Sequence, residues 1–170
     1  MNNWTIERLE KSHERGEFSC GQPSLDHFIR NLVSQYEKRK LGRTYVALRP
    51  GEKRVYGYYT LASSSIFFEH VPEKFAKKLP KHSVPVILLA RLAVDQSAQK
   101  QGLGALLLKD GLMRSLQLST QLGVHAIEVE AIDARAKDFY ERHGFICLND
   151  DPLHLFLPLA TIEQASKPSP

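Results

Sequence analysis

The apolar segment Val84–Val94 and the turn that follows it constrain the fold of this chain more than any other feature. A nearly unbroken apolar run of this length predicts a central strand that is covered on both faces. The turn reads Gln-Lys-Gln-Gly-Leu-Gly over residues 99–104, and a helical pattern of apolar residues begins directly after it. Backbone N–H groups at such a helix N-terminus can hold a diphosphate, and Gly102 and Gly104 let the backbone approach its oxygens. The segment therefore predicts an anion-binding loop.

Apolar periodicities along the rest of the chain alternate between those of strands and helices. They predict strands at 4–9, 44–48, 55–62 (extended towards residue 68), 84–94, 126–131, 145–148 and 154–157, and helices at 23–40, 72–79, 102–121 and 133–143. Ser24 is expected to cap the first of these helices. This order predicts one α/β domain over residues 1–159, in which helices cover both faces of a single mixed sheet. Residues 160–170 are expected to be a flexible C-terminal tail.

The composition is that of a globular protein, with 170 residues of which 42% are hydrophobic and 25% are charged. No apolar run reaches the roughly 20 residues of a membrane-spanning helix, and the N-terminus does not have the pattern of a signal peptide. The two cysteines and seven histidines have no metal-ligand spacing. We therefore expect a cytoplasmic protein with neither a metal site nor a disulfide framework.

Lysine and arginine gather in three clusters although the formal net charge is only +4. The clusters are Lys38–Lys40 with Arg43, the lysines between residues 74 and 81, and the basic residues between 135 and 142. Composition alone favours solvated surfaces for all three. If the clusters lie on one face, they can instead hold a phosphate backbone.

Four longer patterns follow one another along the chain. They are Phe18-x-Cys20-Gly21-x3-Leu25-Asp26-x-Phe28, Arg43-Thr44-Tyr45-Val46 with Gly57-Tyr58-Tyr59-x-Leu61, Leu89-Ala90-Arg91-Leu92-Ala93-Val94-Asp95, and Phe139-Tyr140-x3-Gly144-Phe145. Together with the pattern Gln99-x-x-Gly102-x-Gly104, they resemble the GNAT family of N-acetyltransferases. Within that family they are similar to the toxins of type II toxin–antitoxin systems, which acetylate the amino group of aminoacyl-tRNA. The resemblance covers residues 5–158.

This resemblance implies the GNAT fold, which is a single mixed, mostly antiparallel sheet with helices on both faces and a splayed central strand pair. It also implies acetyl-CoA as the cosubstrate and no metal. The pantetheine arm would lie between the splayed strands, and the diphosphate would lie in the glycine turn. A backbone N–H near Leu92 or Ala93 is the implied oxyanion donor. The implied cofactor-binding residues are Leu92, Ala93, Val94, Gln99, Lys100, Gln101, Gly102, Leu103, Gly104 and Ala105.

By the same resemblance, Tyr140 is the general acid that protonates the departing sulfur, because a tyrosine keeps its proton at neutral pH. The alternative is a packed helix tyrosine beside Phe139. Glu128 and Glu130 share one face of their strand, and they are either water-mediated general bases or solvated residues at the edge of the core. An α-amine with a pKa of about 7.8 depends less on a base than a lysine amine with a pKa of about 10.4, which agrees with an aminoacyl acceptor.

The residues expected to contact RNA or the acyl acceptor are all basic. They are Arg91, Lys38, Arg39, Arg43, Lys77 and Lys78. For Arg91 the alternative is a salt bridge to Asp95 or to a glutamate. Asp133 is expected to cap the helix that carries Tyr140.

The resulting hypothesis is an acetyl-CoA-dependent N-acetyltransferase toxin that modifies aminoacyl-tRNA and so inhibits translation. The resemblance implies a small ribbon-helix-helix antitoxin as a partner, a homodimer, and no membrane association. One alternative is an N-acetyltransferase that acts on a small-molecule amine or a protein N-terminus outside any toxin–antitoxin system. The other is a non-catalytic module that binds CoA or a protein.

Overall fold

The computed structural model describes residues 3–168 of the chain. Its strands are β1 (Thr5–Arg8), β2 (Arg43–Leu48), β3 (Gly57–Ile66), β4 (Val84–Val94), β5 (Ala126–Glu130), β6 (Ile146–Cys147) and β7 (His154–Pro158). They form a seven-stranded sheet in the order β1-β2-β3-β4-β5-β7-β6. β4 and β5 run parallel, whereas the β1–β2, β2–β3, β5–β7 and β6–β7 pairs are antiparallel. The predicted mixed, mostly antiparallel sheet is confirmed.

The helices alternate with these strands as the sequence predicts. They are α1 (Pro23–His27), α2 (Val33–Lys38), α3 (Glu73–Ala76), α4 (Leu103–Leu118), α5 (Ala134–Arg142) and α6 (Leu159–Ser166), with short 3-10 turns at Phe68–His70 and Gln96–Ala98. The chain divides into two compact units. One comprises residues up to 62 together with 90–111, and the other comprises residues 63–89 together with those from 112 onward.

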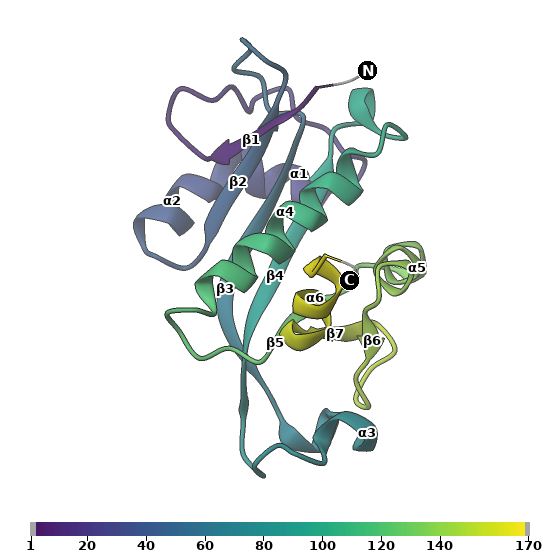
Figure 1. Cartoon of the computed structure of the whole chain (residues 1–170). Helices are drawn as coiled ribbons and strands as arrows, with labels where there is room; N and C mark the ends of the chain where they lie inside the picture. The colour runs from purple at the N-terminus through teal and green to yellow at the C-terminus, as the bar shows by residue number, and fades with distance from the viewer. Residues whose placement is uncertain (1–2, 169–170) are drawn as a thin grey trace. The chain divides into compact units, whose positions relative to one another are not determined.

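In the first unit, helices cover both faces of the β2–β3 ladder (Figure 1). Successive residues of a strand point to opposite faces. The ring of Tyr58 therefore packs against Phe18 and Phe28 on one face. On the other face Gly57 lies against α4, where an added Cβ would be only 2.8 Å from Leu107. A glycine at this position lets α4 pack closely on β3, which fixes the helix whose N-terminus follows the glycine turn.

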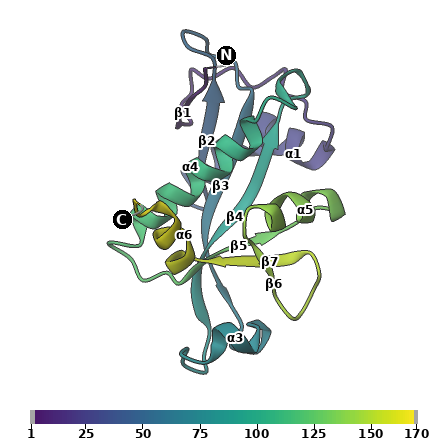
Figure 2. The same ribbon diagram turned by 45° about the vertical axis from the view of Figure 1, so that its right-hand side comes forward.

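In the second unit, β5 lies between β4 and β7 (Figure 2). The antiparallel register places Glu128 opposite Phe156 and Glu130 opposite His154. α5 follows β5 after a short turn and carries Tyr140. An apolar core holds these elements together, formed by Ile66, Val71, Val84, Val86, Ala126, Leu148 and Phe156. Within residues 3–168, no helix combines the length and the apolar character that a membrane span requires.

Several predicted details were wrong. The helix predicted at 23–40 is interrupted by a π-helical segment over Phe28–Leu32, and its N-cap is Gln22 rather than Ser24, because Pro23 already occupies the first turn. α6 begins just before the expected tail, at Leu159, and continues to Ser166, and its Leu159 and Ile162 are buried; the flexibility of residues 160–170 stays a prediction. Leu159 and Ile162 have the i, i+3 spacing of a helix, but the polar residues around them hide this pattern in the sequence. Residues 169 and 170 of that tail lie outside the described range.

Candidate active site

The loop between β4 and α4 is anchored by the carboxylate of Asp95. This residue is 3% exposed, and its oxygens accept hydrogen bonds from the Ser19 N–H at 2.8 Å, the Ser97 N–H at 3.0 Å and the Ser97 hydroxyl at 2.6 Å. Arg54 adds an ion pair at 3.6 Å. Burial would raise the pKa of Asp95, but these hydrogen bonds outweigh burial and hold the pKa below its ordinary range. Sequence reasoning had considered this aspartate only as a possible salt-bridge partner of Arg91.

Gln99 also braces the loop through its side chain. Its Nε2 donates to the carbonyl of Val94 at 2.9 Å and to the carbonyl of Cys20 at 3.0 Å. The Cys20 N–H in turn donates to Asp26 at 2.8 Å. Burial raises the pKa of the Cys20 thiol to about 11, so the thiol stays neutral. The motif over residues 18–28 therefore supports the glycine loop and does not supply a nucleophile.

The glycine turn has the geometry of an anion-binding loop. Residues 99–102 are exposed, and the backbone takes positive φ at Lys100 (62°) and Gly102 (80°). The first bond into α4 runs from the Leu106 N–H to the Gly102 carbonyl at 3.1 Å. The N–H groups of the three residues between them, 103–105, consequently have no partner within the helix. A Cβ added to Gly102 would meet no atom within 4 Å. Open space therefore lies against the backbone at this point.

Residues Leu92–Val94 occupy the end of β4. Ala93 is buried, and Leu92 and Val94 are half-buried. The β4–β5 ladder covers β4 from Val86 to Leu89 and leaves Leu92–Val94 outside it, as expected for a strand pair that splays.

Tyr140 is buried on α5, with its ring centroid 5.3 Å from Phe139 and 5.4 Å from Phe145. The packed-tyrosine alternative therefore describes its ring correctly. Its hydroxyl makes no hydrogen bond to any residue of the range 3–168. Burial raises the pKa of Tyr140, so the phenol keeps its proton at neutral pH. Asp133 caps this helix as predicted, with its carboxylate accepting the Ala136 N–H at 2.8 Å.

Arg91 stacks on aromatic rings. Its guanidinium lies 3.7 Å from the centroid of Phe28 and 5.2 Å from that of Tyr36. The alternative of a salt bridge to Asp95 was wrong, because Arg54 occupies that place. Such stacking fixes the plane of the guanidinium while its N–H groups stay available at the ring edges.

The predicted basic residues differ in how freely they can meet a ligand. Lys38 and Arg39 are exposed at the end of α2 in the first unit, whereas Arg43 donates to the Glu37 carbonyl at 2.9 Å and to its carboxylate at 3.1 Å. In the second unit, the exposed Lys77 and Lys78 follow α3. The structure thus brings Arg43 into an internal ion pair and leaves the other four at the surface of their units.

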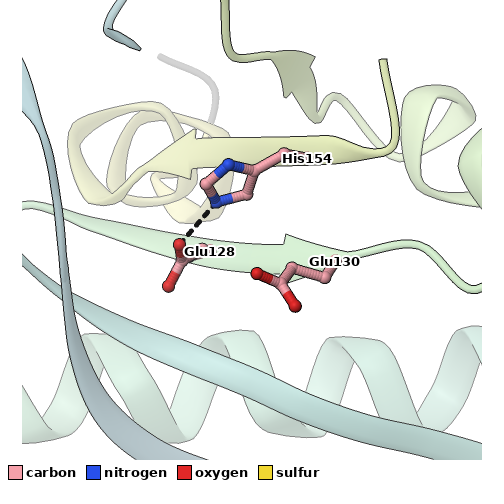
Figure 3. A group of neighbouring side chains, drawn as sticks. All are labelled: Glu128, Glu130 and His154. Carbon is pink, nitrogen blue, oxygen red and sulfur yellow. Dashed lines mark hydrogen bonds and ion pairs between the residues drawn. The ribbon is translucent and has the colours of Figure 1, made fainter. Parts of the chain in front are cut away.

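A further polar group on β5 and β7 consists of Glu128, Glu130 and His154. Sequence reasoning identified the two glutamates but missed the histidine. Glu128 is buried and accepts a hydrogen bond from His154 Nε2 at 2.5 Å, while Glu130 is exposed beside them (Figure 3). His154 Nδ1 lies 2.8 Å from Asp150. Burial lowers the pKa of His154, but its bonds to the two carboxylates outweigh burial and raise it. The glutamates were predicted; His154 lies far away in sequence, and no spacing signals it.

Comparisons with known proteins identify the family of this chain. The model of the acetyltransferase (GNAT) domain matches residues 40–147. The tRNA-acetylating toxin of Mycobacterium tuberculosis is 39% identical over 150 residues, which are 88% of this chain and 89% of that protein.

Two solved structures are similar over nearly their whole length. AtaT complexed with acetyl-methionyl-tRNAfMet has a TM-score of 0.91 at 33% identity, over 97% of this chain and 100% of that one. A tyrosine-to-phenylalanine mutant of the AtaT toxin, bound to the C-terminus of the antitoxin AtaR and acetyl-CoA, has a TM-score of 0.82 at 30% identity, over 97% of this chain and 99% of that one. The domain match includes both the glycine loop and the helix of Tyr140. The chain therefore belongs to the GNAT family of acetyltransferases.

Proposed function

We propose that this protein is an acetyl-CoA-dependent N-acetyltransferase toxin that acetylates the α-amino group of aminoacyl-tRNA and so inhibits translation. The similar proteins carry the substrate assignment, since one is named a tRNA-acetylating toxin and another holds acetyl-methionyl-tRNA. The single structural observation behind the donor assignment is the exposed turn at the N-terminus of α4. The open space at Gly102 and the N–H groups of residues 103–105, which have no partner within the helix, suit a diphosphate.

Acetyl-CoA would be held by two parts of the first unit. The N–H groups of residues 102–105 would bind its diphosphate, and the end of β4, Leu92–Val94, would pair with its pantetheine arm. Bound there, acetyl-CoA supplies an activated acyl group. Gln99 would contribute by bracing the loop, because its side-chain amide already donates to two carbonyls. Lys100 and Gln101 are exposed on the same turn and would flank the phosphates.

Tyr140 would provide the proton that the leaving sulfur needs. Its buried phenol keeps that proton at neutral pH, and no residue in the described range 3–168 uses its hydroxyl. As the C–S bond breaks, the phenol O–H would stabilise the negative charge that develops on sulfur by donating to it, and the proton that the amine loses on acetylation restores the neutral phenol and thiol. A backbone N–H near Leu92 or Ala93 would stabilise the oxyanion, a contribution that typically amounts to about 100- to 1000-fold in rate.

Recognition of tRNA would rest on the exposed basic residues. Lys38 and Arg39 in the first unit, and Lys77 and Lys78 in the second, are free to meet phosphates. Arg91, held flat on Phe28, would present its N–H groups to the acceptor end. Arg43 would act mainly by holding Glu37, so its contact with RNA would be secondary.

The remaining partners follow from the family of toxins. We expect a small ribbon-helix-helix antitoxin and a toxin homodimer, both in the cytoplasm where charged tRNA is found. An antitoxin-bound structure among the similar proteins supports the first expectation in its general form. Size-exclusion chromatography with light scattering, on the toxin alone and with the product of the neighbouring reading frame, tests both.

The test of this function is a direct assay of product. The purified chain is incubated with acetyl-CoA and a mixture of charged tRNAs, and the amino acids released from tRNA are analysed by mass spectrometry. Acetylated aminoacyl-tRNA should appear with wild-type protein and be reduced about 100-fold or more with Tyr140→Phe. Free amino acids, polyamines and a peptide N-terminus serve as competing acceptors. If any of these acceptors is acetylated faster than aminoacyl-tRNA, that acceptor and not tRNA is the substrate.

A further inference from the structure

A group of carboxylates in the second unit has no lysine or arginine partner, although the chain carries a net charge of +4. Glu128, Glu130 and Asp150 surround the imidazole of His154, and His70 lies 3.8 Å from Asp150. No lysine or arginine within residues 3–168 forms an ion pair with any of the three carboxylates. Carboxylates this close repel one another unless a cation compensates them. One imidazole can compensate at most one of the three negative charges, so the group suits an added cation.

The strand register places three ligand-type side chains on one face. Glu130 pairs with His154 across β5 and β7, and Glu128 lies two residues earlier on the same side of β5. Each of the three residues offers one ligand atom, and these atoms all lie within 4.8 Å of one another; Figure 3 shows the three side chains. Two ligands of one tetrahedral zinc ion, each bound at about 2.1 Å, lie about 3.4 Å apart. Binding thus requires the widest pair to close by about 1.4 Å at most, which rotation of the exposed Glu130 can supply, and His154 Nε2 and Glu128, now 2.5 Å apart, to separate by about 1 Å.

His154 is already oriented as a metal ligand. Its Nδ1 lies 2.8 Å from the Asp150 carboxylate, and this bond turns Nε2 towards Glu128. A carboxylate behind the imidazole is the usual outer-sphere partner of a metal-binding histidine, because it fixes the ring and makes the other nitrogen more basic. Glu128, 5% exposed, would be an inner ligand with restricted access to water. A bound ion would replace the hydrogen bond between His154 Nε2 and Glu128.

We propose that Glu128, Glu130 and His154 bind a divalent transition metal ion, with zinc as the best fit and Asp150 as the residue that positions His154. An imidazole with two carboxylates is a ligand set that suits zinc, whereas magnesium and calcium prefer oxygen ligands alone. Acetyl transfer to an amine needs no metal. The site acts by tying β5 to β7, and its effect is on the stability of the second unit.

The test uses untagged full-length protein that has been dialysed against a chelator and then into chelator-free buffer. Zinc chloride and magnesium chloride are each titrated by calorimetry into the wild type, Glu130→Gln and Asp150→Asn. Glu163→Gln, at an exposed position on α6, is the matched control. Melting temperatures are measured for each protein with and without zinc. Far-UV circular dichroism establishes that every variant is folded.

We expect one zinc ion per chain, little response to magnesium, and a melting temperature several degrees higher with zinc in the wild type and in Glu163→Gln. Asp150→Asn should weaken zinc binding about 10- to 100-fold, and Glu130→Gln at least as much. Absence of saturable zinc binding overturns the proposal, as does binding that is unchanged in Glu130→Gln or equally strong for magnesium. Should Asp150→Asn fail to fold, zinc binding by Glu130→Gln decides the question. The exposed carboxylate of Glu130 bonds to no other side chain within residues 3–168, so its replacement should leave the fold intact.

Discussion

Two glycines with the same backbone conformation allow the anion-binding loop to be tested against an internal control. Gly102, in the turn before α4, and Gly51, in the turn between β2 and β3, both have φ of 80°. An added Cβ would meet no atom within 4 Å at either position. Both lie in the first unit. Replacing each by alanine therefore imposes the same backbone strain, and only the position of the new methyl group differs.

The stability effect follows from the backbone alone. An alanine at φ of 80° pays the left-handed penalty of about 1–2 kcal/mol, with no steric clash added. The free energy of unfolding, measured by urea titration, should thus fall by a similar amount in Gly102→Ala and Gly51→Ala. A large difference between them would mean that one turn relaxes to another conformation.

The affinity effect should separate the two variants. If the diphosphate occupies the open space at Gly102, a methyl group there prevents contact with at least one N–H. A hydrogen bond to a charged group contributes about 1.5–3 kcal/mol, so the Kd for acetyl-CoA should rise about 10- to 150-fold in Gly102→Ala. Gly51→Ala should bind as the wild type does. Isothermal titration calorimetry with acetyl-CoA measures both. Equal affinities of the two variants, within threefold, would refute the assignment of the loop.

Three further outcomes are expected. Tyr140→Phe should leave the affinity for acetyl-CoA unchanged and lower turnover about 100-fold or more, and turnover within a few-fold of the wild type would remove the general-acid assignment. Asp95→Ala leaves the partly buried N–H groups of Ser19 and Ser97 without their charged acceptor, so the free energy of unfolding should fall by about 2–4 kcal/mol; a loss below about 1 kcal/mol in urea titration would contradict this. Burial raises the pKa of Glu37, but its bonds to Arg8, Thr44 and Arg43 outweigh burial and hold the pKa below the ordinary 4.5. Its stabilising effect is therefore complete above that value and is lost as the pH falls through the lower pKa of the folded state, and Glu37→Gln should flatten the acid limb of stability below pH 4.5.

The central strand and the glycine loop could be predicted because local sequence determines them. The apolar run of β4 permits only a buried strand, and the positive φ of Gly102 is a conformation that glycine adopts without strain. The helix of Tyr140 was equally local, since Asp133 caps it and Gly144, at φ of 93°, follows its end.

Features that depend on distant partners could not be predicted. The π-helical segment Phe28–Leu32 has ordinary helix periodicity, and only its packing against the strands distinguishes it. The role of Gln99 depends on the carbonyl of Cys20, which is remote in sequence. Likewise, Glu128 and His154 meet only because β5 pairs with β7 in one particular register. Spacing along a chain carries no signal for such contacts.

The central proposal is that the turn before α4 holds the acetyl donor and that Tyr140 protonates its sulfur. A crystal structure of the protein with CoA tests this most directly. Diphosphate oxygens should lie about 2.7–3.2 Å from the N–H nitrogens of residues 102–105. The sulfur should lie within hydrogen-bond reach of the Tyr140 hydroxyl. CoA bound elsewhere, or a Tyr140 hydroxyl directed away from the sulfur, would contradict the account.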